Sequence, residues 1–114
     1  MKYKILSIIP LMLLLVSCTL TANLTPDQRY YSAIRIYNDN VEEYLAAYDV
    51  ASLTTQTRWK AEIDPIIRFA NQALTTWGDN LYGLSADSKE QAWLIAKREL
   101  ITALVLYGVI EEVE

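Results

Sequence analysis

The sequence contains no histidine and only one cysteine, and these two shortages remove several classes of function. Without histidine the chain lacks the commonest general base and the commonest transition-metal ligand. The glutamate and histidine pairs that hold di-iron centres in helical bundles are excluded for the same reason. A single cysteine cannot form an internal disulfide bond, so the fold must rest on packing.

Basic residues and glycines are also scarce. The chain has 114 residues, of which 10 are lysine or arginine and 14 are aspartate or glutamate, for a formal net charge of −4. An acidic chain of this kind is a poor candidate for binding nucleic acid, and we expect no such partner. Only three glycines are present and 53% of the residues are hydrophobic, which is typical of one small helical domain.

The first 17 residues have the pattern of an export signal. Lys2 and Lys4 precede an apolar run over residues 5–16. This run is shorter than the roughly 20 apolar residues that a membrane-spanning helix needs, and it has the length of a signal-peptide hydrophobic region. The sequence therefore predicts a cleaved signal peptide over residues 1–17.

The apolar run ends in Leu15, Val16, Ser17 and Cys18, which resemble the lipobox of bacterial lipoproteins. The resemblance implies that a dedicated signal peptidase cuts before Cys18 and that this cysteine is acylated. Two or three acyl chains anchor a protein stably, whereas one chain is marginal. In the alternative interpretation, the leader is an ordinary secretory signal and Cys18 is incidental.

The same resemblance carries expectations about location. Residues 18–24 would form a lipidated tether, and membrane lipid would be a partner through the acylated Cys18. Thr19 stands where an aspartate commonly retains enterobacterial lipoproteins in the inner membrane. In a Gram-negative host, the resemblance therefore implies the outer membrane, with the protein facing the periplasm.

From Thr25 onward the chain has the periodicity of amphipathic helices. Thr25, Pro26 and Gln28 form the capping sequence of a first helix, and a turn is predicted within residues 49–55. The apolar positions of this first helix alternate at spacings of four and three residues, so they face one partner helix. They are Tyr30, Ile34, Tyr37, Val41, Tyr44, Tyr48 and Ala51.

A second helix with the same spacing passes through Pro65. Because the apolar stripe keeps its phase across the proline, we expect a kink there, and the alternative is a fresh helix capped by Asp64. Gly78 is expected to cap the C-terminus of this helix. Its apolar positions are Trp59, Ile63, Ile66, Ile67, Ala70, Ala73, Leu74 and Trp77.

A third helix is predicted after the cap candidates Ser85 and Asp87. Within it, residues 100–110 are uncharged on every face, too short a run to span a bilayer. This segment packs centrally, docks on a partner or touches lipid. The core positions expected in this helix are Trp93, Leu94, Ala96, Leu100, Ile101, Leu104, Tyr107 and Ile110.

Neither catalysis nor metal binding is indicated by the remaining pattern. Three acidic pairs occur, and paired carboxylates can act as acid and base or hold a divalent metal. All three fall on helix faces expected to be solvated, so we expect no catalytic residues, metal or cofactor. The pairs are Glu42 with Glu43, Glu62 with Asp64, and Asp87 with Glu90.

Four apolar or aromatic residues lie off the core stripes and are candidates for an interaction surface: Tyr31, Phe69, Leu81 and Tyr82. Most of the other aromatic residues fall in phase with the stripes, as expected for ordinary packing. The sequence thus indicates a candidate interaction surface and no catalytic constellation.

These patterns predict an all-α antiparallel three-helix bundle over residues 25–114, with a kinked second helix. The expected function is a non-enzymatic interaction or structural role at the bacterial envelope, with an envelope protein as partner. A membrane-active protein that modulates channels or lysis is the alternative, since small helical lipoproteins of phage and prophage gene sets look similar. A third possibility, a small-ligand carrier, predicts an apolar cavity between the helices.

Overall fold

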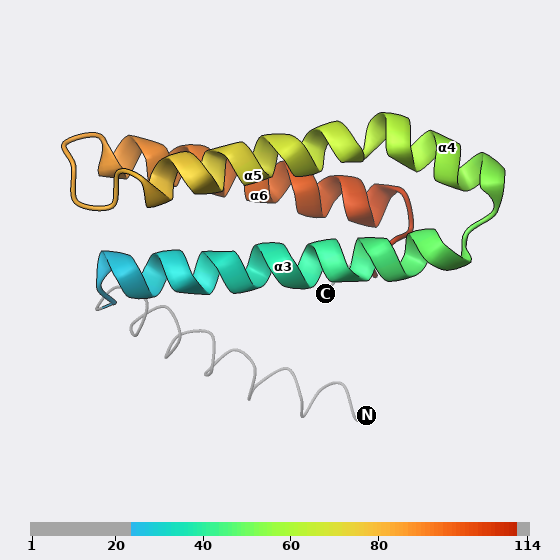
Figure 1. The fold of residues 1–114 in the computed structure, drawn as a ribbon, viewed down its shortest axis with the longest axis horizontal. Helices are drawn as coiled ribbons and strands as arrows, with labels where there is room; N and C mark the ends of the chain where they lie inside the picture. Colours follow the sequence, from blue (N-terminus) through green and yellow to red (C-terminus); the bar gives the residue numbers. More distant parts are fainter. Residues whose placement is uncertain (1–23, 112–114) are drawn as a thin grey trace, which may run out of the picture.

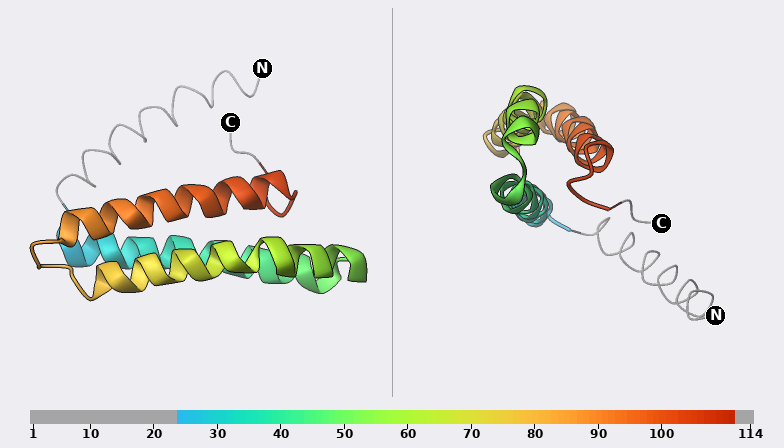
Figure 2. Two further views of the ribbon diagram at one scale, coloured as in Figure 1. Left: turned by 90° about the horizontal axis from the view of Figure 1, so that it is seen from above. Right: turned by 90° about the vertical axis from the view of Figure 1, so that its right-hand side faces the viewer.

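The computed structural model describes residues 24–111, and within them the chain is helical and has no strand. The helices are α3 (Pro26–Val50), α4 (Leu53–Glu62), α5 (Asp64–Gly78) and α6 (Ala86–Leu106). Because α4 runs into α5 as one bent helix, three helical rods lie side by side, each reversing the direction of the one before (Figures 1 and 2). The predicted all-α bundle is confirmed. The predicted signal peptide and Cys18 lie outside the described residues.

The start of α3 follows the predicted cap, and the turn into α4 lies within the predicted residues 49–55. The Thr25 hydroxyl oxygen accepts from the Gln28 backbone N–H at 3.2 Å, and the Thr25 N–H donates to the Gln28 side chain at 2.9 Å. This capping box supplies a partner for two backbone groups that a helix N-terminus leaves unpaired. At the turn, Ser52 caps α4 by accepting from the Thr55 N–H at 3.2 Å.

The bend between α4 and α5 occurs at Ile63, two residues before Pro65. Pro65 has no N–H to donate to the preceding turn, so the ladder is interrupted. Ile63 keeps helical angles, and its carbonyl accepts from the N–H groups of Ile66 and Ile67 at 2.9 and 3.0 Å. No side chain caps α5, so the kink is confirmed and the alternative of a helix capped by Asp64 is wrong.

The core contains a row of aromatic pairs that joins α3 to the other two rods. Three tyrosines of α3, spaced seven residues apart, each meet a different tryptophan. The pairs and their ring-centroid distances are Tyr30 with Trp77 at 5.3 Å, Tyr37 with Trp93 at 6.5 Å, and Tyr44 with Trp59 at 6.1 Å. Edge-to-face and tilted pairs at these distances stabilise beyond the area they bury.

Gly78 has a different role from the predicted cap. It belongs to the last turn of α5, and the residue in the capping position is Asp79, in a right-handed helical conformation. A Cβ atom on Gly78 would collide with the end of the Tyr30 ring. The close approach of the Tyr30 ring therefore favours glycine at this position, and the prediction of a glycine cap was wrong.

Helix α6 differs from the expected pattern in two respects. Leu94, predicted in the core, is 37% exposed, whereas Ala103, which was not predicted, is 7% exposed. The helix ends at Leu106, and Gly108 adopts a left-handed conformation with φ of +75° that turns the chain back. As a result Ile110 packs against the core from outside the helix.

Candidate functional site

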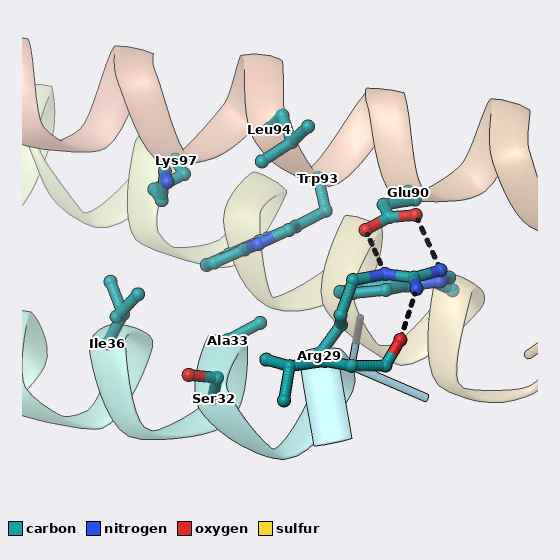
Figure 3. Close-up of a pocket in the computed structure, with 10 residues that line it drawn as sticks. Arg29, Ser32, Ala33, Ile36, Glu90, Trp93, Leu94 and Lys97 are labelled. Carbon is teal, nitrogen blue, oxygen red and sulfur yellow. Dashed lines mark hydrogen bonds and ion pairs between the residues drawn. The ribbon is translucent and has the colours of Figure 1, made fainter. Parts of the chain in front are cut away.

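The parallel rods α3 and α6 both pack on α5 and touch each other at few points, which leaves a cavity between them. This α3–α6 cavity has a volume of about 260 Å³. Figure 3 shows Trp93 projecting from α6 toward α3, beside Ala33 and Ile36. The lining residues are Leu24, Arg29, Ser32, Ala33, Ile36, Trp77, Glu90, Trp93, Leu94 and Lys97.

One end of the α3–α6 cavity is closed by an ion pair. The Arg29 guanidinium donates to the two carboxylate oxygens of Glu90 at 3.0 and 3.4 Å, and to the Leu24 carbonyl at 3.0 Å (Figure 3). Both side chains are largely shielded from solvent. The two charges compensate each other, so this end of the cavity presents no net charge.

Leu94 and Lys97 extend the apolar wall along α6. Both residues also line a second hollow of about 350 Å³, together with Arg98, Ile101 and Thr102. Leu94 is not buried in the core as predicted, because α3 does not cover the side of α6 that faces it. Within the described residues, no acidic side chain lies at ion-pair distance from Lys97.

Of the four predicted surface residues, the structure places Tyr31 and Tyr82 at the same end of the bundle. Tyr82 is 71% exposed, and its hydroxyl donates to the Asp27 carboxylate at 2.7 Å. This hydrogen bond raises the pKa of Tyr82 above its usual value. Tyr31, 67% exposed, lies one helical turn after Asp27 on α3.

The other two predicted surface residues lie elsewhere. Phe69 is half-exposed on α5 and lines a cavity of about 220 Å³ between α5 and α6, with Lys89 among the other lining residues. Leu81, in the loop after α5, is partly buried and packs against the core. The four side chains therefore do not form one continuous surface.

Three members of the acidic pairs, Glu62, Asp64 and Glu90, take part in contacts between helices, and Glu90 is largely shielded and not on a solvated face as expected. The Tyr107 hydroxyl and the nearby Arg58 guanidinium hold the pKa of Glu62 below its usual value. Asp64 accepts from the Tyr44 hydroxyl at 2.8 Å. In residues 24–111 no cluster of three acidic or cysteine side chains that could hold a metal ion is present.

The uncharged segment 100–110 contributes mostly to the core. Leu100 and Leu104 are almost fully buried, and Tyr107 packs against the core cluster, while Leu106 is 77% exposed. None of the helices formed by residues 24–111 combines the length and hydropathy needed to cross a membrane.

No protein-family model matches the chain, and no curated protein or solved structure matches it significantly. The function of this chain must therefore be inferred from its own residues.

Proposed function

We propose that this chain is a lipid-anchored, non-enzymatic protein of the bacterial cell envelope that docks another envelope component through its helical bundle. The acylated Cys18 supplies the anchor, and residues 18–24 supply the tether. In a Gram-negative host the bundle lies on the periplasmic side of the outer membrane.

The observation that carries the proposal is the lipobox-like sequence Leu15, Val16, Ser17 and Cys18 behind a basic and apolar leader. An anchor of two or three acyl chains needs no membrane-spanning helix in the rest of the chain. The exposed aromatic rings of Tyr31 and Tyr82, near the point where the tether meets α3, are side chains of the kind that dominate docking energies.

Burial in the C-terminal helix favours this role over the membrane-active alternative. Leu100 and Leu104 are 1% and 0% exposed, so their side chains already have a packed apolar environment. Entry of segment 100–110 into lipid would require α6 to leave the bundle, at the cost of these core contacts. A docking role uses the bundle as it is folded.

Replacing Cys18 by serine, in a chain whose residues 1–17 are exchanged for an ordinary cleavable secretory signal, is expected to move the protein from the membrane pellet to the soluble envelope fraction. The serine hydroxyl does not accept the thioether-linked diacylglyceryl group, and without acyl chains the anchoring energy is lost. Fractionation of a bacterium expressing each form measures this, with mass spectrometry of the N-terminal peptide. A Thr19→Ser chain is the control and should stay in the pellet. An unmodified Cys18 peptide in the wild type would refute the anchor.

The docking half of the proposal is tested by photo-cross-linking in intact membranes. Photoreactive residues at Tyr31, Tyr82 and Leu106 sample the aromatic end and the uncharged segment. We expect one dominant protein adduct from the tyrosine positions. Adducts to lipid alone, mainly from Leu106, would instead favour the membrane-active alternative.

A further inference from the structure

We propose that the α3–α6 cavity binds a single-chain anionic amphiphile, with the chain along Trp93 and the carboxylate or phosphate group at Lys97. The site goes beyond the docking role and does not depend on the anchor. Its elements are an apolar stretch, a neutral closed end and a cation at the other end, which together match an amphiphile of this charge.

The apolar stretch is built from both rods. Trp93 and Ala33 are 2% and 4% exposed and form the floor, while Ile36 and Leu94, each 37% exposed, stand on opposite walls (Figure 3). The walls keep this exposure because α6 packs on α5 and barely meets α3. A hydrocarbon chain laid here would remove apolar surface of both walls from water.

The dimensions limit the ligand to one chain. From Glu90 to Lys97 the cavity wall follows seven residues of α6, about 10 Å at the helical rise. The volume of about 260 Å³ lies just below the range of roughly 300–1,000 Å³ found for small-molecule pockets. A phospholipid with two chains is too large for this space.

The charged side chains determine which way the ligand lies in the cavity and the sign of its headgroup charge. At the closed end Glu90 is already held by Arg29 at 3.0 Å, so this carboxylate does not repel the ligand. At the open end Lys97 lines both hollows and has no acidic partner among the described residues, with Arg98 next to it in the second hollow. An anionic headgroup would therefore find its counter-charge at Lys97, at the open end of the cavity.

The neighbouring α5–α6 cavity provides the comparison. It is about 220 Å³, has Lys89 as its cation and contains the exposed ring of Phe69, but no tryptophan lines it. Lys89 and Lys97 lie on the same helix and both are half-buried. Lys89→Gln is thus a matched control for Lys97→Gln.

The experiment is photolabelling of the full chain in phosphatidylcholine nanodiscs with decanoate that carries a diazirine near its methyl end. Because the methyl end would lie toward the Arg29–Glu90 end of the cavity, we expect adducts on the peptides that contain Ala33 and Glu90. Labelling should fall about three- to tenfold in Lys97→Gln, the loss expected for a part-buried ion pair, and stay level in Lys89→Gln. Unlabelled decanoate and decyl phosphate should compete, whereas decyltrimethylammonium should not.

Three results would overturn the proposal: equal labelling of Lys97→Gln and wild type, equal competition by the cationic analogue, or adducts confined to the Phe69 peptide. If decyl phosphate competes far better than decanoate, the natural headgroup is a phosphate, and the reverse order assigns a carboxylate. The Cys18→Ser chain should label like the wild type, so failure of the anchor and failure of this site give different results.

Discussion

Replacing Trp93 by alanine is expected to lower the free energy of unfolding by about 3–5 kcal/mol, the range for deleting a buried aromatic side chain. The indole is 2% exposed and its ring meets that of Tyr37 at 6.5 Å. A domain of this size has a total free energy of unfolding of roughly 5–10 kcal/mol, so the variant should be partly unfolded near physiological temperature. Urea unfolding followed by helical circular dichroism measures the loss.

The control for this experiment is Phe69→Ala. It removes an aromatic ring of the same bundle, but the Phe69 side chain is 52% exposed and leaves little cavity behind. Its cost should stay below about 1 kcal/mol. If the two variants lost the same free energy, Trp93 would not be part of a packed core and the aromatic row would have no stabilising role.

Tyr44→Phe is expected to cost about 1.5–3 kcal/mol, the value for a hydrogen bond to a charged group. The Tyr44 side chain is 3% exposed and its hydroxyl donates to Asp64 at 2.8 Å across the bend between α4 and α5. Phenylalanine keeps the ring and leaves the Asp64 carboxylate without this donor. Tyr48→Phe on the same helix is the control and should change stability by no more than about 0.5 kcal/mol.

The same variant has a signature at alkaline pH. Burial, with the hydrogen bond to Asp64, raises the pKa of Tyr44 well above its usual value near 10. The folded state therefore holds this proton more tightly than the unfolded state. Its contribution is complete below about pH 10 and is lost as the pH rises from there toward the folded-state pKa.

Unfolding measured between neutral pH and pH 11 should show this loss in the wild type and a shallower one in Tyr44→Phe. The pKa values of Tyr30, Tyr82 and Tyr107 are also raised, so some decline should remain in the variant. Identical pH profiles for the two chains would mean that the Tyr44 hydroxyl is not held by Asp64.

The helices and most of the core were predictable because they depend on local spacing and local caps. The seven-residue repeat of Tyr30, Tyr37 and Tyr44 identified the inward face of α3, and the capping residue Thr25 identified its start. The phase of the apolar stripe was also sufficient to predict a kink near Pro65. Each of these signals lies within a few residues of the feature that it predicts.

The features that sequence reasoning missed depend on how far apart the rods stand. Gly78 was predicted to be a cap because the residues next to it in the sequence give no sign that the Tyr30 ring of another helix lies against it. Leu94 has the correct phase for a core position, but the gap between α3 and α6 leaves it on a wall. The α3–α6 cavity was therefore not recognisable as a set of residues, although an apolar cavity was one of the three possibilities.

The uninterrupted length of α3 fixes how far the bundle reaches from the point where the chain enters it. Its 25 residues correspond to about 37 Å, with the loop after α5 beside its start and the turn into α4 at its far end. At that far end Val50 and Leu53 are 87% and 79% exposed. A chain held at its N-terminal side and standing upright would thus act as a spacer that presents a small apolar tip roughly 40 Å from the membrane surface.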